Sequence, residues 1–305
     1  MKEILLEIIY IIAGLISLVT AYYAYTDKKH PAPKATALFW GLLGIVFIAG
    51  KYVPPALVGI VLIIMGCITA MKKVKFGSQS NASDSDREAA SKRIGGKIFL
   101  PALTIGVVAF IFGQFIKPLG GLVGLGAGAI LATILALIIT KSKTRNVAYD
   151  GSRLLQQIGS ASILPQLLAA LGSVFAAAGV GEIISKGIGG VLSEGFILAA
   201  IIAYCLGMAI FTIIMGNAFA AFAVITAGIG VPFVLSQGAN PAVAGILALT
   251  AGYCGTLMTP MAANFNIVPA AVLETKSKYR VILSQLPMAL ILLVIHVILM
   301  YFLAF

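Results

Sequence analysis

Charged residues are scarce in this sequence, and that scarcity excludes a water-soluble globular enzyme. Asp, Glu, Lys and Arg make up 10% of the 305 residues, against about 25% in soluble domains. Hydrophobic residues make up 60%, and the mean hydropathy is +1.07. Because a membrane-spanning helix needs about 20 apolar residues, the chain has room for roughly eight to ten spans. We therefore expect an all-α, polytopic membrane protein.

The groups that disulfides, metal sites and catalysis require are also missing. The three cysteines, Cys67, Cys205 and Cys254, each lie inside an apolar run without metal-ligand spacing, which is typical of small buried hydrophobes. No Ser, Cys or His has a base and an orienting partner in a known arrangement, and the Gly-x-Ser-x-Gly, His-Glu-x-x-His and phosphate-loop motifs are absent. We expect no enzymatic activity and no zinc or copper site.

The positive charge that the chain does carry is a topology signal. The net charge of +11 comes from short links between apolar runs, which argues against nucleic-acid binding. The opposite links hold one basic residue each, Lys51, Lys117 and Lys186. Basic links remain in the cytoplasm, so we expect an external N-terminus and these cytoplasmic links: 27–34, 72–97, 141–153 and 274–280.

The apolar runs predict the spans and the organisation of the chain. We expect a three-helix N-terminal part at 1–76, a polar cytoplasmic linker at 77–97, and a second part at 98–305. Residues 77–90 of the linker have a disorder-like composition. The prediction is about eight transmembrane helices plus one re-entrant hairpin and one discontinuous helix. The apolar runs are 4–25, 35–50, 55–71, 98–116, 119–140, 163–180, 196–235, 241–273 and 281–305.

Sidedness requires one pair of segments to re-enter the membrane. The chain is predicted outside at Gly195 and inside by Lys276, yet four apolar segments lie between these residues. Four crossings would return the chain to the outside. We therefore place a re-entrant hairpin at 196–235, with its tip at Gly216 to Ala218, and a broken crossing at 241–273. Non-helical backbone at membrane depth is tolerated where it is buried in protein or lines a cavity.

Two such breaks could bind an anion and a sodium ion. A broken helix exposes N–H groups that attract a carboxylate and carbonyl groups that can ligate sodium. The side chains at the breaks are neutral oxygen bearers, which suit a hard monovalent cation. Thr212 and Thr226 could instead bond to their own helix. The asparagines could simply bond to backbone groups that the kinks leave without partners. The candidate substrate and ion site comprises Thr212, Gly216, Asn217, Ala218, Thr256, Thr259, Asn264 and Asn266.

These breaks resemble those of the ion-transporter superfamily. The segment 211–218, Phe-Thr-Ile-Ile-Met-Gly-Asn-Ala, is similar to the hairpin signature of divalent-anion/sodium symporters, which usually show Ser-Asn-Thr at the tip. Here Gly216 and Ala218 flank the asparagine instead. Thr259-Pro260 through Ile267 resembles the proline-containing break of their discontinuous helix.

Nearly the whole chain, and especially 253–266, resembles a bacterial membrane family. That family is associated through its genomic setting with pyroglutamyl peptidase and 5-oxoprolinase, and its members are predicted to be one subunit of a 5-oxoproline transporter. The resemblance implies 5-oxoproline (pyroglutamate) as substrate, and the bacterial cytoplasmic membrane as location.

A count of repeat units predicts a partner. In the superfamily, two inverted copies of a unit containing a hairpin and a broken helix form the site, and residues 98–305 of this chain resemble one such unit. A homodimer cannot supply the second, because the basic links hold every copy in the same orientation. We expect a smaller membrane subunit of opposite topology, and the resemblance implies one too. The alternatives are a non-transporting membrane scaffold, a transporter of another organic anion, and, more remotely, an intramembrane enzyme.

Overall fold

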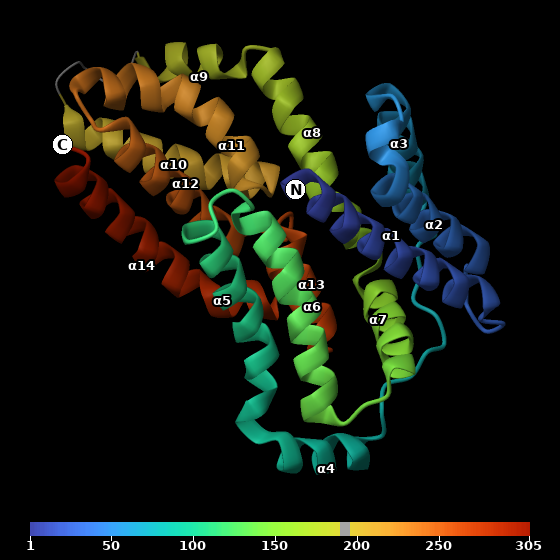
Figure 1. Ribbon diagram of the computed structural model, residues 1–305. Helices are drawn as coiled ribbons and strands as arrows, with labels where there is room; N and C mark the ends of the chain where they lie inside the picture. Colours follow the sequence, from blue (N-terminus) through green and yellow to red (C-terminus); the bar gives the residue numbers. More distant parts are fainter. Residues whose placement is uncertain (190–195) are drawn as a thin grey trace. The chain divides into compact units, whose positions relative to one another are not determined.

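The computed structural model describes residues 1–189 and 196–305, and every regular element in those ranges is a helix (Figure 1). This confirms the all-α prediction. Contacts divide the chain into two compact units, Met1–Gly159 and Ser160–Phe305. The first unit contains helices from both sides of the predicted linker at 77–97. The predicted division at this linker is a different kind of boundary and stays a prediction. Gly195, the reference point for sidedness, lies outside the described residues.

The first unit begins with a tightly packed helical hairpin. Helices α1 and α2 approach at Gly14 and Gly44, where a Cβ added to Gly14 would lie 2.8 Å from the carbonyl oxygen of Gly44. Small residues of this kind allow close packing of membrane helices. Proline at the first position starts the second and third helices. The elements are α1 (Lys2–Thr26), α2 (Pro33–Ala49), η1 (Gly50–Tyr52) and α3 (Pro55–Ala70).

Two segments expected to be polar links contain helices. Helix α4 (Asp84–Ile94) forms within the predicted linker because Ser83 caps it and Glu88 pairs with Lys92 at 2.8 Å. Helix α7 (Thr144–Ile158) forms within the basic link 141–153. In Figure 1, α4 lies across the ends of η2 (Gly95–Phe99), α5 (Leu100–Gln114) and α6 (Gly120–Thr140).

A polar cluster joins part of the linker to α7 and to the end of α1. The Asp27 carboxylate accepts hydrogen bonds from the backbone N–H and the hydroxyl of Ser78, at 2.6 and 2.8 Å. Gln156 of α7 donates to Oε1 of Gln79 at 2.9 Å. Burial tends to raise the pKa of Asp27, but the hydrogen bonds from Ser78 and Lys29 outweigh it and hold the pKa below its usual value. Residues 78 and 79 are therefore ordered by contacts that composition does not reveal.

The second unit contains both interruptions that were expected from the sequence. Helix α10 leads through Gly216 and Asn217 into α11, which continues as the π-helix η4, and α12 is separated from α13 by residues 258–262. Helices α10, α12 and α14 enclose the core, which includes Tyr204, Met208 and Ala251. The elements are η3 (Gly159–Ile163), α8 (Leu164–Ala177), α9 (Val180–Gly189), α10 (Ile197–Met215), α11 (Ala218–Ile225), η4 (Thr226–Val234), η5 (Leu235–Gln237), α12 (Pro241–Leu257), α13 (Ala263–Val272) and α14 (Arg280–Leu303).

Eight helices of the described residues are long and apolar enough to cross a membrane, as expected for a polytopic membrane protein. The two arms of the predicted hairpin, Ile197–Met215 and Ala218–Gln237, are among them. Their length alone permits a full crossing, so the re-entry of 196–235 stays a prediction. The remaining candidates are Lys2–Thr26, Pro33–Tyr52, Asp84–Gln114, Gly120–Thr140, Thr144–Ala177 and Arg280–Leu303.

Candidate functional site

The turn between α10 and α11 is built by one glycine and one asparagine. Gly216 has a φ of +67°, which L side chains rarely adopt, and its N–H donates to the Thr212 carbonyl at 2.7 Å. Asn217 then caps α11, because its Oδ1 accepts from the N–H groups of Phe219 and Ala220 at 2.9 and 3.4 Å. The sequence Gly-Asn therefore ends one helix and starts the next, and the N–H groups of the turn keep hydrogen-bond acceptors.

The break between α12 and α13 is held by side chains within it and after it. The Asn266 amide donates to the carbonyl oxygens of Thr256 and Thr259, both at 2.7 Å. The Thr259 hydroxyl accepts from the N–H of Met261 at 3.2 Å. Backbone groups freed by a break must find partners inside the protein. Asn266 and Thr259 supply these partners.

The turn and the break meet in space. The Thr259 hydroxyl donates to the carbonyl oxygen of Ile213, in the last turn of α10, at 2.9 Å. A Cβ added to Gly216 would lie 2.7 Å from the carbonyl carbon and oxygen of Met261. Gly255 of α12 also lies directly against the Ala209 carbonyl of α10, where a side chain would not fit. The glycines therefore serve both the turn geometry and a close approach between segments about 45 residues apart.

A cavity of about 310 Å³ lies where the turn meets the break. Asn217, Thr256 and Asn264 supply its polar lining, and no charged side chain of the described residues lines it. Phe219, Tyr253 and Phe265 form a continuous aromatic series, with ring centroids 6.0 and 6.2 Å apart in successive pairs. The remaining lining residues are Leu168, Gly216, Ala218 and Met261.

The first turns of two helices begin at this cavity. Ala218, the first residue of α11, and Asn264, the second residue of α13, both line it. Asn217 caps α11, whereas α13 has no side-chain cap. Most N–H groups of these first turns already have acceptors, at Asn217 in α11 and at the Ala262 carbonyl in α13. The helix dipole still gives each N-terminus a partial positive charge, which favours an anion. The cavity thus lies at the positive ends of two helix dipoles, and no basic side chain of the described residues lines it.

Two buried oxygen atoms near the breaks have no hydrogen-bond partner among the described residues. They are Oγ1 of Thr212 and Oδ1 of Asn266, both on side chains that are wholly inaccessible to solvent. Thr212 Oγ1 lies between α10 and α12, 3.2 Å from where a Cβ on Gly252 would be. Buried polar atoms are usually paired, so these two atoms require an explanation.

The structure brings most of the predicted site together but in two groups. Gly216, Asn217, Ala218, Thr256 and Asn264 line the cavity. Thr212, Thr259 and Asn266 lie outside the cavity lining and are almost fully buried. The weaker candidate Thr226 lies in η4, with its hydroxyl 2.8 Å from that of Tyr204, away from the lining.

Sequence reasoning did not single out the aromatic lining. Phe219 follows Asn217 by two positions, and Phe265 directly follows Asn264. The aromatic residues beside both polar breaks could have indicated this lining. A second cavity, of about 410 Å³, includes Asn217 and Phe219 together with Gly172 of α8, so Asn217 lines two cavities.

These features define a polytopic α-helical membrane protein with an uncharged polar cavity where a helical turn meets a broken helix. Over residues 7–305 the chain matches the family described as "Protein of unknown function (DUF979)", and it belongs to that family. No curated protein and no solved structure matched the chain. The family description names no activity.

Proposed function

We propose that the chain is a membrane subunit of a secondary transporter that binds a small carboxylate in the cavity at the two breaks. The observation that carries the proposal is that both interruptions predicted from the sequence line one cavity, whose described lining has amide and hydroxyl groups and no charged side chain. A carboxylate there would face the first turns of α11 and α13, which favour negative charge. This proposal gives the chain no catalytic step.

The first substrate to test is 5-oxoproline. The resemblance of the chain to a family predicted to transport it supports this choice, and so does the lining. The rings of Phe219, Tyr253 and Phe265 suit a compact ring, and the amides of Asn217 and Asn264 suit a lactam and a carboxylate. Another small organic anion with a ring would satisfy the same contacts.

We propose sodium as the coupling ion. Thr212 Oγ1 and Asn266 Oδ1 are neutral oxygens that lack partners and lie at the two breaks. Neutral oxygens and the carbonyl groups of broken helices are typical sodium ligands in transporters. No metal-binding group of His, Cys, Asp or Glu is present among the described residues, so the proposal relies on these uncharged oxygens.

The proposed transporter includes a second, smaller membrane subunit. The chain supplies one hairpin-like turn and one broken helix, whereas an inverted-repeat site uses two such sets. The partner would carry the other set in the opposite orientation. We place the pair in the bacterial cytoplasmic membrane, with the N-terminus of this chain outside.

A membrane scaffold is the second candidate, and one observation favours it. Asn217 and Asn266 already bond to backbone groups at the breaks, as purely structural residues would. The two candidates differ in what they require of Asn264, which lines the cavity and is exposed. A scaffold would tolerate its truncation.

The test is uptake of 5-oxoproline by proteoliposomes that contain the co-purified subunits, with and without a sodium gradient. Asn217→Ala and Asn264→Ala should lower uptake at least about tenfold, since each removes a polar contact to a charged ligand. The matched control is Asn240→Ala, which removes the asparagine cap of α12, outside the cavity lining. Full uptake in Asn264→Ala would favour the scaffold. Absence of uptake by the wild-type pair would exclude this substrate.

A further inference from the structure

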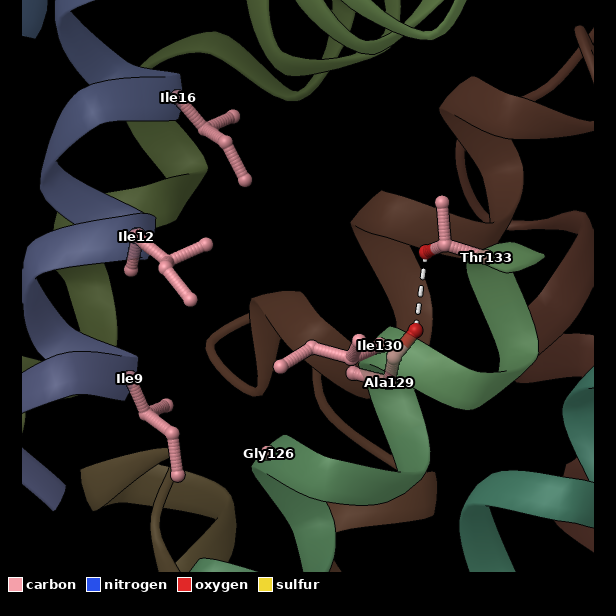
Figure 2. A pocket seen from close by; sticks show the side chains of 8 residues that line it. Ile9, Ile12, Ile16, Gly126, Ala129, Ile130 and Thr133 are labelled. Atoms are coloured by element: carbon pink, nitrogen blue, oxygen red, sulfur yellow. Dashed lines mark hydrogen bonds between the residues drawn. The ribbon is translucent and has the colours of Figure 1, made fainter. Parts of the chain in front are cut away.

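An apolar groove runs along one side of α1 in the first unit, far in sequence from the proposed transport site. Ile9, Ile12 and Ile16 of α1 face Gly126 and Ile130 of α6 across a cavity of about 200 Å³ (Figure 2). Ile12 and Ile16 also line a second cavity of about 380 Å³, between α1 and α7. The shared residues make one continuous groove between three helices.

Along most of its length, the described residues of the groove offer no free polar group to a water-soluble ligand. The Thr133 hydroxyl donates to the Ala129 carbonyl of its own helix at 2.9 Å, as Figure 2 shows. The Ser152 hydroxyl points to Gln79, 3.4 Å from its Oε1. From Ile9 to Val19 the groove follows α1 for about 15 Å. An apolar channel of this length, open on its side, suits a hydrocarbon chain.

One end of the groove is basic. Thr144, the first residue of α7, lines it and is flanked by the exposed side chains of Lys143 and Arg145. Arg93 donates to the Thr140 carbonyl, 2.9 Å away, at the C-terminal end of α6, which precedes Thr144 by four residues. Within the described part of the chain, Lys143 and Arg145 have no carboxylate at ion-pair distance. Their charge is available to an external anion.

We infer that this groove binds an anionic phospholipid, with an acyl chain along α1 and the phosphate beside Lys143 and Arg145. The apolar walls and the cations at one end match the two halves of such a lipid, and the link 141–153 is predicted to face the cytoplasm, where anionic headgroups attract basic clusters. A zwitterionic lipid would fill the groove but would bind more weakly, because its headgroup has no net charge to attract the basic end of the groove.

The test is native mass spectrometry of the delipidated full-length protein titrated with dioleoylphosphatidylglycerol or dioleoylphosphatidylcholine. The variant Lys143→Gln/Arg145→Gln should bind phosphatidylglycerol about 30-fold more weakly, because two basic contacts are lost. Lys117→Gln/Lys186→Gln removes the same charge from exposed positions elsewhere and should bind normally. Equal phosphatidylglycerol affinity in both double variants would overturn the inference.

A second variant tests the groove itself. Gly151 lines it, and a Cβ there meets nothing within 4 Å, so Gly151→Leu starts a side chain from open space in the groove. It should weaken binding of both lipids, whereas Gly106→Leu, at an equally open position on α5, should not. If Gly151→Leu releases a co-purified membrane subunit and leaves lipid binding unchanged, the groove is a protein interface and the lipid assignment is wrong.

Discussion

Replacing Gly216 with alanine tests two reasons for glycine at the turn: the positive φ and the close contact with Met261. The added Cβ must tolerate a φ of +67° and must also avoid the Met261 carbonyl, 2.7 Å away. Ordinary contact begins at 3.4 Å, so the turn and the break must part by about 0.7 Å. The left-handed conformation costs about 1–2 kcal/mol and the overpacking about 1–3 kcal/mol, which gives roughly 2–5 kcal/mol together.

Gly179→Ala is the matched control, because Gly179 has a φ of +72° and a Cβ added there would meet nothing within 4 Å. Gly179→Ala should lower the free energy of unfolding only by the cost of the left-handed conformation, about 1–2 kcal/mol. At about 3 °C per kcal/mol, the apparent unfolding temperature should fall by about 3–6 °C for Gly179→Ala and about 6–15 °C for Gly216→Ala. Thermal unfolding in detergent at one scan rate measures both. Equal losses would refute the close approach between the turn and the break.

Three further predictions concern single hydrogen-bonding groups. Asn266→Leu removes two donors from buried carbonyl groups and should lower stability by about 2–4 kcal/mol, measured by thermal unfolding; an unchanged unfolding temperature would contradict the role of Asn266 at the break. Tyr204→Phe removes the contact to Thr226 and should speed amide hydrogen exchange in η4, whereas unchanged exchange would show that the contact does not hold the π-helix. Asp27→Asn should destabilise the first unit at neutral pH, because the pKa of Asp27 is lowered by folding and its stabilisation is lost only as pH falls below 3.8; a deficit independent of pH would exclude the charged contact to Ser78.

The interruptions could be predicted from the sequence because their causes are local. Gly216-Asn217 carries its own turn and cap chemistry, and Pro260 cannot continue a helix that needs its N–H. The expected re-entry of 196–235 used charge counts in distant links, and the lengths of the two arms do not test it.

Helices α4 and α7 show why polar segments are harder to predict. Composition made 77–90 look disordered, although Ser83 supplies an N-cap and Glu88 a partner for Lys92. In α7, polar side chains such as Gln156 are buried because Gln79 of the linker reaches them. A contact between residues 77 positions apart has no signal in local periodicity.

Apolar length and composition determined that the chain is an all-α membrane protein, and glycine, asparagine and proline determined where its helices are interrupted. Tertiary structure decided that the turn at Gly216 and the break at Met261 share one cavity and that Phe219, Tyr253 and Phe265 line it. It also buried Thr212 and Asn266 outside that lining. The physical reason is that helix breaks follow from local backbone chemistry, whereas a site depends on which buried surfaces meet when the helices pack.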